Sequence, residues 1–587
     1  MSENRTATIA LTAYYVDKYA RLSTAPSAES PSYSDDTAYT LQLRANTSAD
    51  TSARNQLIRS IDSASGDHVW RRLEKLTFQY RWTGSTEQAS LANWLKQELT
   101  SFSSRLKVRS TSYNVYLGLP GDYDAHVDFY SQKGEVRRFS GTSALAPLVD
   151  SVLPWNAKRN LSVWVAGSPN GDVTANVVYV NFGREEDFEL LAQRQLSVSG
   201  KIVLTRLTDA HTSVRSVVEA ASARGARAVV FYPDPQQFNL RDDAMVFPHS
   251  SSLPGEAVPL LNGLRGLGES GTSDSSIDSA SAVLLPIPTA VIGYKGAADL
   301  FKSMEEEEGP SAPGMFRGDL LVYKMGSAEA LYRLVVSSRG SKAQWRITNV
   351  CAYLKGSHEP DKYILLGTNY DAWSTGAVER SGAALLLELI RLLSSREEPP
   401  KRTLMFCFWD ASTVGSLGAI NFVEEHMALL QSRLVAYINA EAPVQGNVTL
   451  EAAVSPELRS VVREAAQRTS SAPFVRYLAT PVADLSFRGP QGQAYSLRAT
   501  LYDHLWTFRT FVDPELTVSR TVVKLWAEVA SRLADALVLP FDVRSLAARV
   551  RLVTERVGRE QHQLPFLKDP VALLSAAVGE LQNITVK

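Results

Sequence analysis

Four carboxylates near the middle of this 587-residue chain could act together, because each lies at or close to the end of an apolar run. A cluster of carboxylate oxygens can hold a hard cation such as Ca²⁺ or Mg²⁺. The simpler interpretation is that two of them cap helices or turns, while the other two are solvated or accept bonds from loop N–H groups. The capping pair is Asp371 and Asp410, and the other pair is Glu379 and Glu441.

The elements that must position these side chains alternate between strand-like and helix-like runs. Apolar runs of strand length are separated by amphipathic runs of helix length, which predicts βαβ units on a parallel sheet. In such sheets, functional groups gather past the carboxyl ends of the strands. The predicted order is strand Tyr363–Tyr370, helix Ser381–Ser395, strand Thr403–Asp410, helix Ala419–Leu430 and strand Leu434–Glu441.

The other residue types that carry hydrolytic chemistry are poorly placed. A two-zinc hydrolase needs nitrogen ligands, carboxylate ligands and a separate base. The chain has eight histidines, and none lies at a predicted carboxyl end of a strand of this sheet. His-Glu-x-x-His, Gly-x-Ser-x-Gly and P-loop patterns are all absent from the sequence.

Composition indicates an ordinary globular chain, with 44% hydrophobic and 21% charged residues. The net charge of −1 gives no sign of a nucleic-acid partner. Cys351 and Cys407 lie in predicted core strands and are expected to be buried free thiols. No apolar run long enough to span a membrane and no signal peptide are visible. Acceptor tripeptides for N-glycosylation begin at Asn4, Asn46, Asn160, Asn447 and Asn583.

The pattern along the chain divides it into five parts. Residues 1–65 are rich in Ser, Thr and Ala without periodicity and are expected to be extended and poorly structured. Residues 66–116 and 336–515 carry α/β patterns that belong together, so the β-rich part 117–335 is interpreted as an inserted domain. Residues 516–587 are predicted to be helical.

Several segments together resemble the glutamate carboxypeptidase / transferrin receptor family, from about His68 to the end. They include TGSTEQAS, GARAVVFYPDP, NVCAYLKGSHEPDKYILLGTNYDAW, KRTLMFCFWDASTVGSLGAINFVEEH and VAYINAEAPVQGNVTL. The resemblance implies a zinc-exopeptidase-like α/β domain in two parts. It also implies that 117–335 is a protease-associated (PA, apical) domain and that 516–587 is part of a helical dimerisation domain.

The resemblance also locates the family's site, whose residues have changed. The family's metal-ligand positions fall on Asn369, Glu379, Thr413, Glu441 and Ala499, and its base position falls on Ser412. Asparagine and alanine cannot replace imidazole at zinc, and a serine without a partner is no base at neutral pH. No catalytic residue and no bound zinc are therefore expected.

We therefore interpret the chain as a non-catalytic, pseudopeptidase member that acts as a receptor or protein-binding scaffold. A protein partner and a homodimer through the C-terminal helices are expected. The resemblance implies an extracellular or cell-surface protein with an N-terminal membrane span and a longer helical domain. Neither is visible here, so a fragment or a soluble variant is expected.

Two alternatives stay open. The first is a divergent metallo-exopeptidase in which Asp371, Glu379 and Glu441 hold one hard cation and His504 is drawn in by a shifted local register. The second is an evolutionary remnant without a selected function.

Overall fold

The computed structural model describes residues 48–577 with internal gaps. The gaps are 79–80, 82, 119–122, 131–135, 141–164, 208–213, 236–239, 242–245, 260, 264–283, 327–330, 339–341, 373, 459–479, 490–497, 561–571 and 574. The predicted acceptors Asn4, Asn46, Asn160 and Asn583 lie outside the described residues.

The largest sheet is the parallel-centred sheet that the sequence predicts. Strand β15 pairs in parallel with β16 on one side and β17 on the other, and β17 pairs in parallel with β20. The order is β1 (Leu106–Gly118), β14 (Lys342–Leu354), β16 (Arg402–Trp409), β15 (Glu359–Asn369), β17 (Leu434–Asn439), β20 (Val482–Arg488) and β18 (Val444–Gln445), with β19 (Thr449–Val454) antiparallel to β20. The α/β fold class is therefore confirmed.

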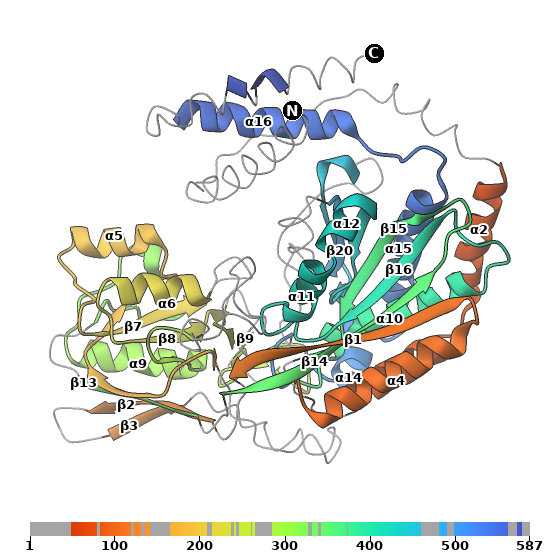
Figure 1. Ribbon diagram of the computed structural model, residues 1–587. Helices are drawn as coiled ribbons and strands as arrows, with labels where there is room; N and C mark the ends of the chain where they lie inside the picture. The colour runs from red at the N-terminus through yellow and green to blue at the C-terminus, as the bar shows by residue number, and fades with distance from the viewer. Residues whose placement is uncertain are drawn as a thin grey trace.

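Helices cover both faces of this sheet (Figure 1). One face carries α2 (Ser48–Ser63), α3 (Asp67–Thr77), α4 (Thr86–Phe102), α10 (Ala377–Ser394) and α15 (Thr517–Asp535). The other face carries α11 (Leu417–Glu425) and α12 (Met427–Arg433).

Helix α10 lies at the centre of the first layer and is buried along almost its whole length. Its Ala- and Leu-rich sequence favours a helix. Gly382 lets it approach the sheet closely, since a Cβ there would stand 1.7 Å from the carbonyl oxygen of Ala440. Helix α10 is thus fixed against the chain just beyond β17.

Among the described residues, the inserted part contains two four-stranded sheets and three α-helices. One sheet is parallel, and its strands are β12 (Thr289–Val291), β8 (Ala228–Pro233), β7 (Ile202–Leu207) and β6 (Val177–Tyr179). The other is antiparallel, and its strands are β3 (Val136–Ser140), β2 (Tyr123–Tyr130), β13 (Leu331–Ser338) and β5 (Gly171–Ala175). The helices are α5 (Glu185–Gln193), α6 (Val214–Ala223) and α9 (Tyr294–Glu306). Two short parallel pairs, β4 (Val165–Ala166) with β11 (Leu261–Asn262) and β9 (Leu240–Arg241) with β10 (Leu253–Pro254), complete the strands.

The insertion leaves and re-enters the main sheet through two neighbouring strands. Strands β1 and β14 are antiparallel along their whole length, from Leu106 opposite Leu354 to Gly118 opposite Lys342. The chain therefore departs and returns at adjacent points, so a separate domain fits there without breaking the main sheet. Figure 1 shows this domain beside the far ends of the two strands.

Two sequence-based expectations about helices need correction. Residues 48–63, expected to be extended, form α2, whose Leu57 and Ile61 are buried against α10 and α15. Helix α15, assigned to a separate helical domain, packs in the same core as α10. Both errors have one cause. Both segments are positioned by tertiary packing against α10, which a local pattern does not report.

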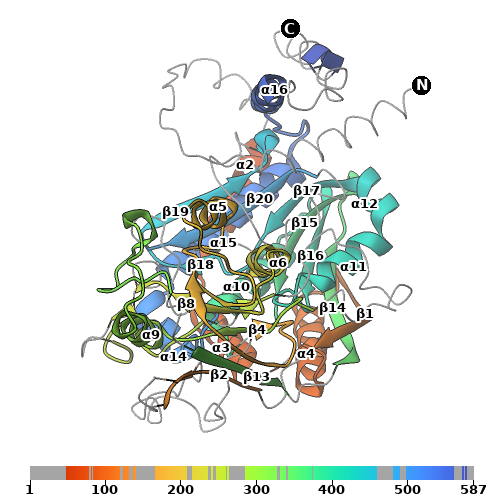
Figure 2. The same ribbon diagram turned by 90° about the vertical axis from the view of Figure 1, so that its left-hand side faces the viewer.

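The last long helix, α16 (Val543–Glu560), lies apart from the sheet layers (Figure 2). It packs beside η5 (Pro456–Leu458) and buries Ala547 and Thr554. Val543 and Leu552 on the same helix are exposed. Within the part of the chain that the structure describes, no helix is long and apolar enough to cross a membrane.

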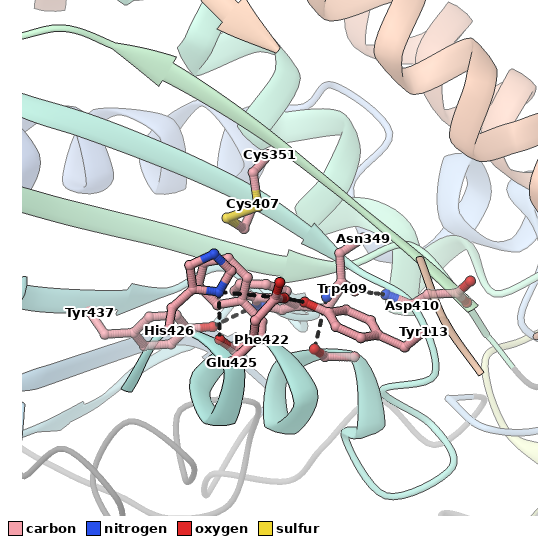
Figure 3. The surroundings of a disulfide bond; sticks show 11 residues. Tyr113, Asn349, Cys351, Cys407, Trp409, Asp410, Phe422, Glu425, His426 and Tyr437 are labelled. Atoms are coloured by element: carbon pink, nitrogen blue, oxygen red, sulfur yellow. Dashed lines mark hydrogen bonds and ion pairs between the residues drawn. A yellow bond between two sulfur atoms is a disulfide. The ribbon is translucent and has the colours of Figure 1, made fainter. Parts of the chain in front are cut away.

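The prediction that Cys351 and Cys407 are free thiols is wrong. They lie directly opposite each other on β14 and β16, with Cα atoms 4.2 Å apart, and form a disulfide. Figure 3 shows the bond near Trp409 and Phe422, which share its hydrophobic cluster. A local sequence pattern does not reveal this pairing, because the partners are 56 residues apart and β15 lies between them in the chain.

Removing this disulfide should destabilise the fold. We expect the Cys351→Ala/Cys407→Ala double variant to lose about 2–4 kcal/mol in the free energy of unfolding, because the bond restricts the unfolded chain. Urea unfolding of both proteins measures this, with and without reductant. The variant should not respond to reductant. Equal midpoints for the two proteins, together with two titratable thiols in denatured wild type, would contradict the bond.

Candidate functional site

The site lies where β15, β16 and β17 end side by side. The parallel register places Asn369 opposite Trp409 and Gly367 opposite Asn439, so the residues that follow these strands meet at one edge. The edge carries the predicted site residues that follow the three strands, namely Asn369, Asp371, Asp410, Ser412, Thr413 and Glu441. Glu379 joins them from the first turn of α10.

Asp371 is fully buried, and both of its carboxylate oxygens accept hydrogen bonds. One accepts from the backbone N–H of Ser412 at 3.1 Å. The other accepts from the N–H and the hydroxyl of Thr413, at 2.9 and 2.5 Å. Burial raises the pKa of Asp371, and these hydrogen bonds and the charge of Arg380 oppose that rise. Ser412 and Thr413, at the family's base and ligand positions, thus hold Asp371 in place. Asp371 therefore binds the turn after β16, in line with the interpretation that it caps a helix or turn.

Asp410 is also satisfied from within the fold. Its carboxylate accepts from the backbone N–H groups of Thr348 and Ala411, at 3.0 and 2.9 Å, from the Gln88 amide at 3.1 Å and from the Tyr370 hydroxyl at 3.2 Å. Burial, aided by the charge of Asp371, raises the pKa of Asp410 to about 7. Gln88 belongs to TGSTEQAS, one of the segments that resemble the family. The sequence therefore singled out this segment but did not reveal that Gln88 contacts Asp410.

Glu379 is buried, with 4% of its surface exposed, and it faces Arg498. The Nε of Arg498 lies 3.9 Å from a Glu379 carboxylate oxygen, and Nη1 of Arg498 donates to the Gln445 side-chain oxygen at 3.3 Å. Glu441 is half-buried. The sequence-based reasoning found the carboxylates but missed Arg498, because the arginine arrives from a segment far along the chain.

The two positions that would carry histidine ligands have no imidazole. The Asn369 amide donates to the backbone carbonyl of Asp371 at 3.0 Å, and its side-chain oxygen is buried without a hydrogen-bond partner. Ala499 is half-buried and has a positive φ of 57°.

His504 does not serve the carboxylates. It is buried, and its Nδ1 lies at the start of α14 (Leu505–Thr507), where it accepts from the backbone N–H of Thr507 at 3.4 Å. Its ring packs against Phe247 and Trp506. Its neighbour Asp503, which the sequence did not single out, accepts from the N–H of Val378 at 2.9 Å and so caps α10. Burial raises the pKa of Asp503 to about 7.

The donor set does not fit the zinc that the resemblance implies for an active member. Both oxygens of Asp371 are already engaged by N–H and O–H groups. Among the described residues, no three His, Cys, Asp or Glu side chains lie together as metal ligands would. The set proposed for a single hard cation, Asp371, Glu379, Glu441 and His504, is therefore not brought together either.

Comparisons with known proteins agree with this fold. The model of peptidase family M28 matches residues 349–486, and that of the PA domain matches residues 173–298. The chain therefore contains a peptidase family M28 domain with an inserted PA domain. A solved peptidase M28 precursor from Shewanella amazonensis has the same fold, with a TM-score of 0.53 and 18% identity over 84% of this chain and 98% of its own.

Named relatives extend the resemblance at moderate identity. The glutamate carboxypeptidase 2 homolog of Caenorhabditis briggsae is 29% identical over 75% of this chain and 65% of its own length. Aminopeptidase NAALADL1 of Rattus norvegicus is 27% identical over 85% and 76%. Transferrin receptor protein 2 of the same species is 31% identical over 53% and 39%. The chain spans less than two thirds of the C. briggsae relative that it matches. The family resemblance is confirmed, and the loss of catalysis stays a prediction.

The buried His504 should make the fold sensitive to acid. Burial lowers the pKa of His504 to about 3, against about 6.5 when unfolded. Between about pH 3 and pH 6.5, the unfolded chain therefore binds a proton on His504 that the folded protein does not bind. The contribution of His504 to the free energy of unfolding is complete above pH 6.5 and is lost as the pH falls below it. When the pH falls from 7 to 5, the free energy of unfolding should therefore drop by about 2 kcal/mol less in His504→Gln than in wild type.

Urea unfolding at the two pH values measures this difference. The raised pKa values of Asp410 and Asp503 act in the opposite direction, but they are present in both proteins and cancel in the comparison. An identical pH response of wild type and His504→Gln would show that the buried imidazole does not govern acid sensitivity.

Proposed function

We propose that this protein is a catalytically inactive M28-type protein that acts as a receptor or protein-binding scaffold. The observation that carries the proposal is the environment of Asp371. Its carboxylate accepts three hydrogen bonds from Ser412 and Thr413, the residues at the family's base and ligand positions, and these fill three of its roughly four lone-pair sites.

The chemistry of hydrolysis supports the same proposal. A peptidase of this family needs a base to activate water and metal ions to polarise the carbonyl. Ser412 has a hydroxyl in place of the base, and Asn369 and Ala499 lack imidazole. General base catalysis alone contributes about 10²–10⁴-fold to rate, and losing several groups that act as a unit removes the mechanism.

Binding is the function that an intact fold with an altered site can still perform. The M28 and PA domains both have well-packed cores, so each can present a stable surface. One relative is named a receptor, and we carry that role to this chain as part of the proposal. The predicted homodimer through the C-terminal helices stays a prediction, since a single chain is described.

A divergent metallo-exopeptidase finds less support. It requires His504 to join Asp371, Glu379 and Glu441, but the imidazole is buried among aromatic rings and caps α14.

Metal analysis tests the proposal. We expect purified protein to carry no stoichiometric zinc and to cleave neither acidic dipeptides nor aminoacyl substrates, because the ligand and base positions are altered. Elemental analysis and hydrolysis assays with added Zn²⁺ measure this. As a matched control, Ala499→His alone should also stay inactive, since Asn369 and Ser412 are unchanged. Stoichiometric zinc together with hydrolysis by wild type would contradict the proposal.

We also propose that the protein is extracellular or at the cell surface. Disulfides persist in oxidising compartments, and this one joins β14 to β16 inside a hydrophobic cluster of the main sheet. Asn447 adds an independent argument, because it is exposed between β18 and β19, with Thr449 of its acceptor tripeptide at the start of β19.

Asn447 should then carry an N-glycan. We expect full-length protein made in a eukaryotic secretory system to lose mass on peptide-N-glycosidase treatment, with Asn447 converted to Asp in its peptide. Thr449→Val removes the acceptor and should abolish the modification, whereas the matched variant Thr449→Ser preserves it. An unmodified Asn447 peptide in wild type would count against this site.

A further inference from the structure

The strand-end edge concentrates buried negative charge. Four carboxylates there are almost inaccessible to solvent, namely Asp371, Glu379, Asp410 and Asp503. Burying an ionised carboxylate is costly unless hydrogen bonds or a cation compensate it. In a two-zinc site, the metal ions supply the positive charge. If this chain holds no zinc, its own residues must supply it.

Arg380 is the first candidate, because it is fully buried and follows Glu379 on α10. Its Nε donates to the Tyr370 carbonyl at 3.0 Å, and Nη1 donates to the carbonyls of Thr375 and Leu76, both at 2.9 Å. Two of these carbonyls flank Asp371 in the loop after β15. The guanidinium therefore lies against this loop, and its charge acts on all four carboxylates.

Arg498 is the second candidate and comes from the other side. Its side chain is 37% exposed, whereas that of Glu379 is 6% exposed, so the arginine lies between solvent and the buried carboxylate. It spans from Glu379 to Gln445 on β18. This cation also stands next to Ala499, the position of a lost histidine ligand.

We propose that Arg380 and Arg498 are built-in cations that take over the electrostatic role of the metal ions in an active M28 site. Arg380 compensates Asp371 from inside the fold, and Arg498 compensates Glu379 from the solvent side. The inference rests on the proposed function and deepens it. It explains why the buried carboxylates can persist in a site that does not hold zinc.

A purely structural role makes a different prediction. If Arg380 only anchors carbonyl groups and Arg498 only packs over Glu379, then the effect of removing either arginine does not depend on the charge of the acid. If they are counter-cations, removing the arginine is much less harmful once the acid is neutral. Double-mutant cycles separate the two cases.

The experiment is urea unfolding of full-length protein in two cycles. One combines Arg498→Met with Glu379→Gln, and the other combines Arg380→Met with Asp371→Asn. We expect a coupling of at least about tenfold in the unfolding equilibrium constant for each pair. The exposed pair Arg333–Asp172 in the PA domain is the matched control, for which less than about fivefold is expected. Arg498→Lys, which keeps the charge, should retain most of the stability.

Each outcome either supports or overturns the proposal. Coupling above the control range with rescue by Arg498→Lys supports the proposal, and an additive cycle overturns it for that arginine. If Arg380→Met alone does not fold, recovery of folded protein in the Arg380→Met/Asp371→Asn variant supports the proposal, and failure of both overturns it. Zinc content is measured on the same samples. Additive cycles in zinc-free protein overturn this inference alone, whereas stoichiometric zinc overturns the proposed function as well.

Discussion

The parallel register of β15, β16 and β17 against α10 is the constraint on which the rest of the structure depends. It brings the ends of three strands to one edge and places the first turn of α10 over them. Gly382 makes this approach possible, because a side chain there would collide with the Ala440 carbonyl. The edge is therefore a fixed concentration of polar groups, whatever chemistry the individual residues support.

Burying several carboxylates close together at this edge is electrostatically costly, and hydrogen-bond donors and arginines of the chain offset that cost. Asp371 is bound by Ser412 and Thr413, and Asp410 by backbone, amide and hydroxyl donors. Arg380 and Arg498 provide positive charge close to the carboxylates. A carboxylate with several donors and a nearby guanidinium is stable when buried. The same contacts stabilise this edge of the sheet.

The inserted domain packs against this edge, because Ala411 and Tyr502 belong to its hydrophobic cluster and Phe247 packs against Tyr502. Strands β1 and β14 carry the PA domain out and back as one antiparallel ladder, and the Cys351–Cys407 disulfide ties β14 to β16. The sheet is continuous across the insertion.

The sequence by itself determined the alternation of strands and helices, the place of the insertion and the changed residues Asn369, Ser412, Thr413 and Ala499. These follow from local periodicity and residue identity, which the chain carries at each position. Only the tertiary structure decided what Asp371 and Glu379 contact, that the two cysteines pair, that α2 is helical and that His504 is buried away from the carboxylates. Each of these depends on contacts between segments far apart in the chain, which no local pattern encodes.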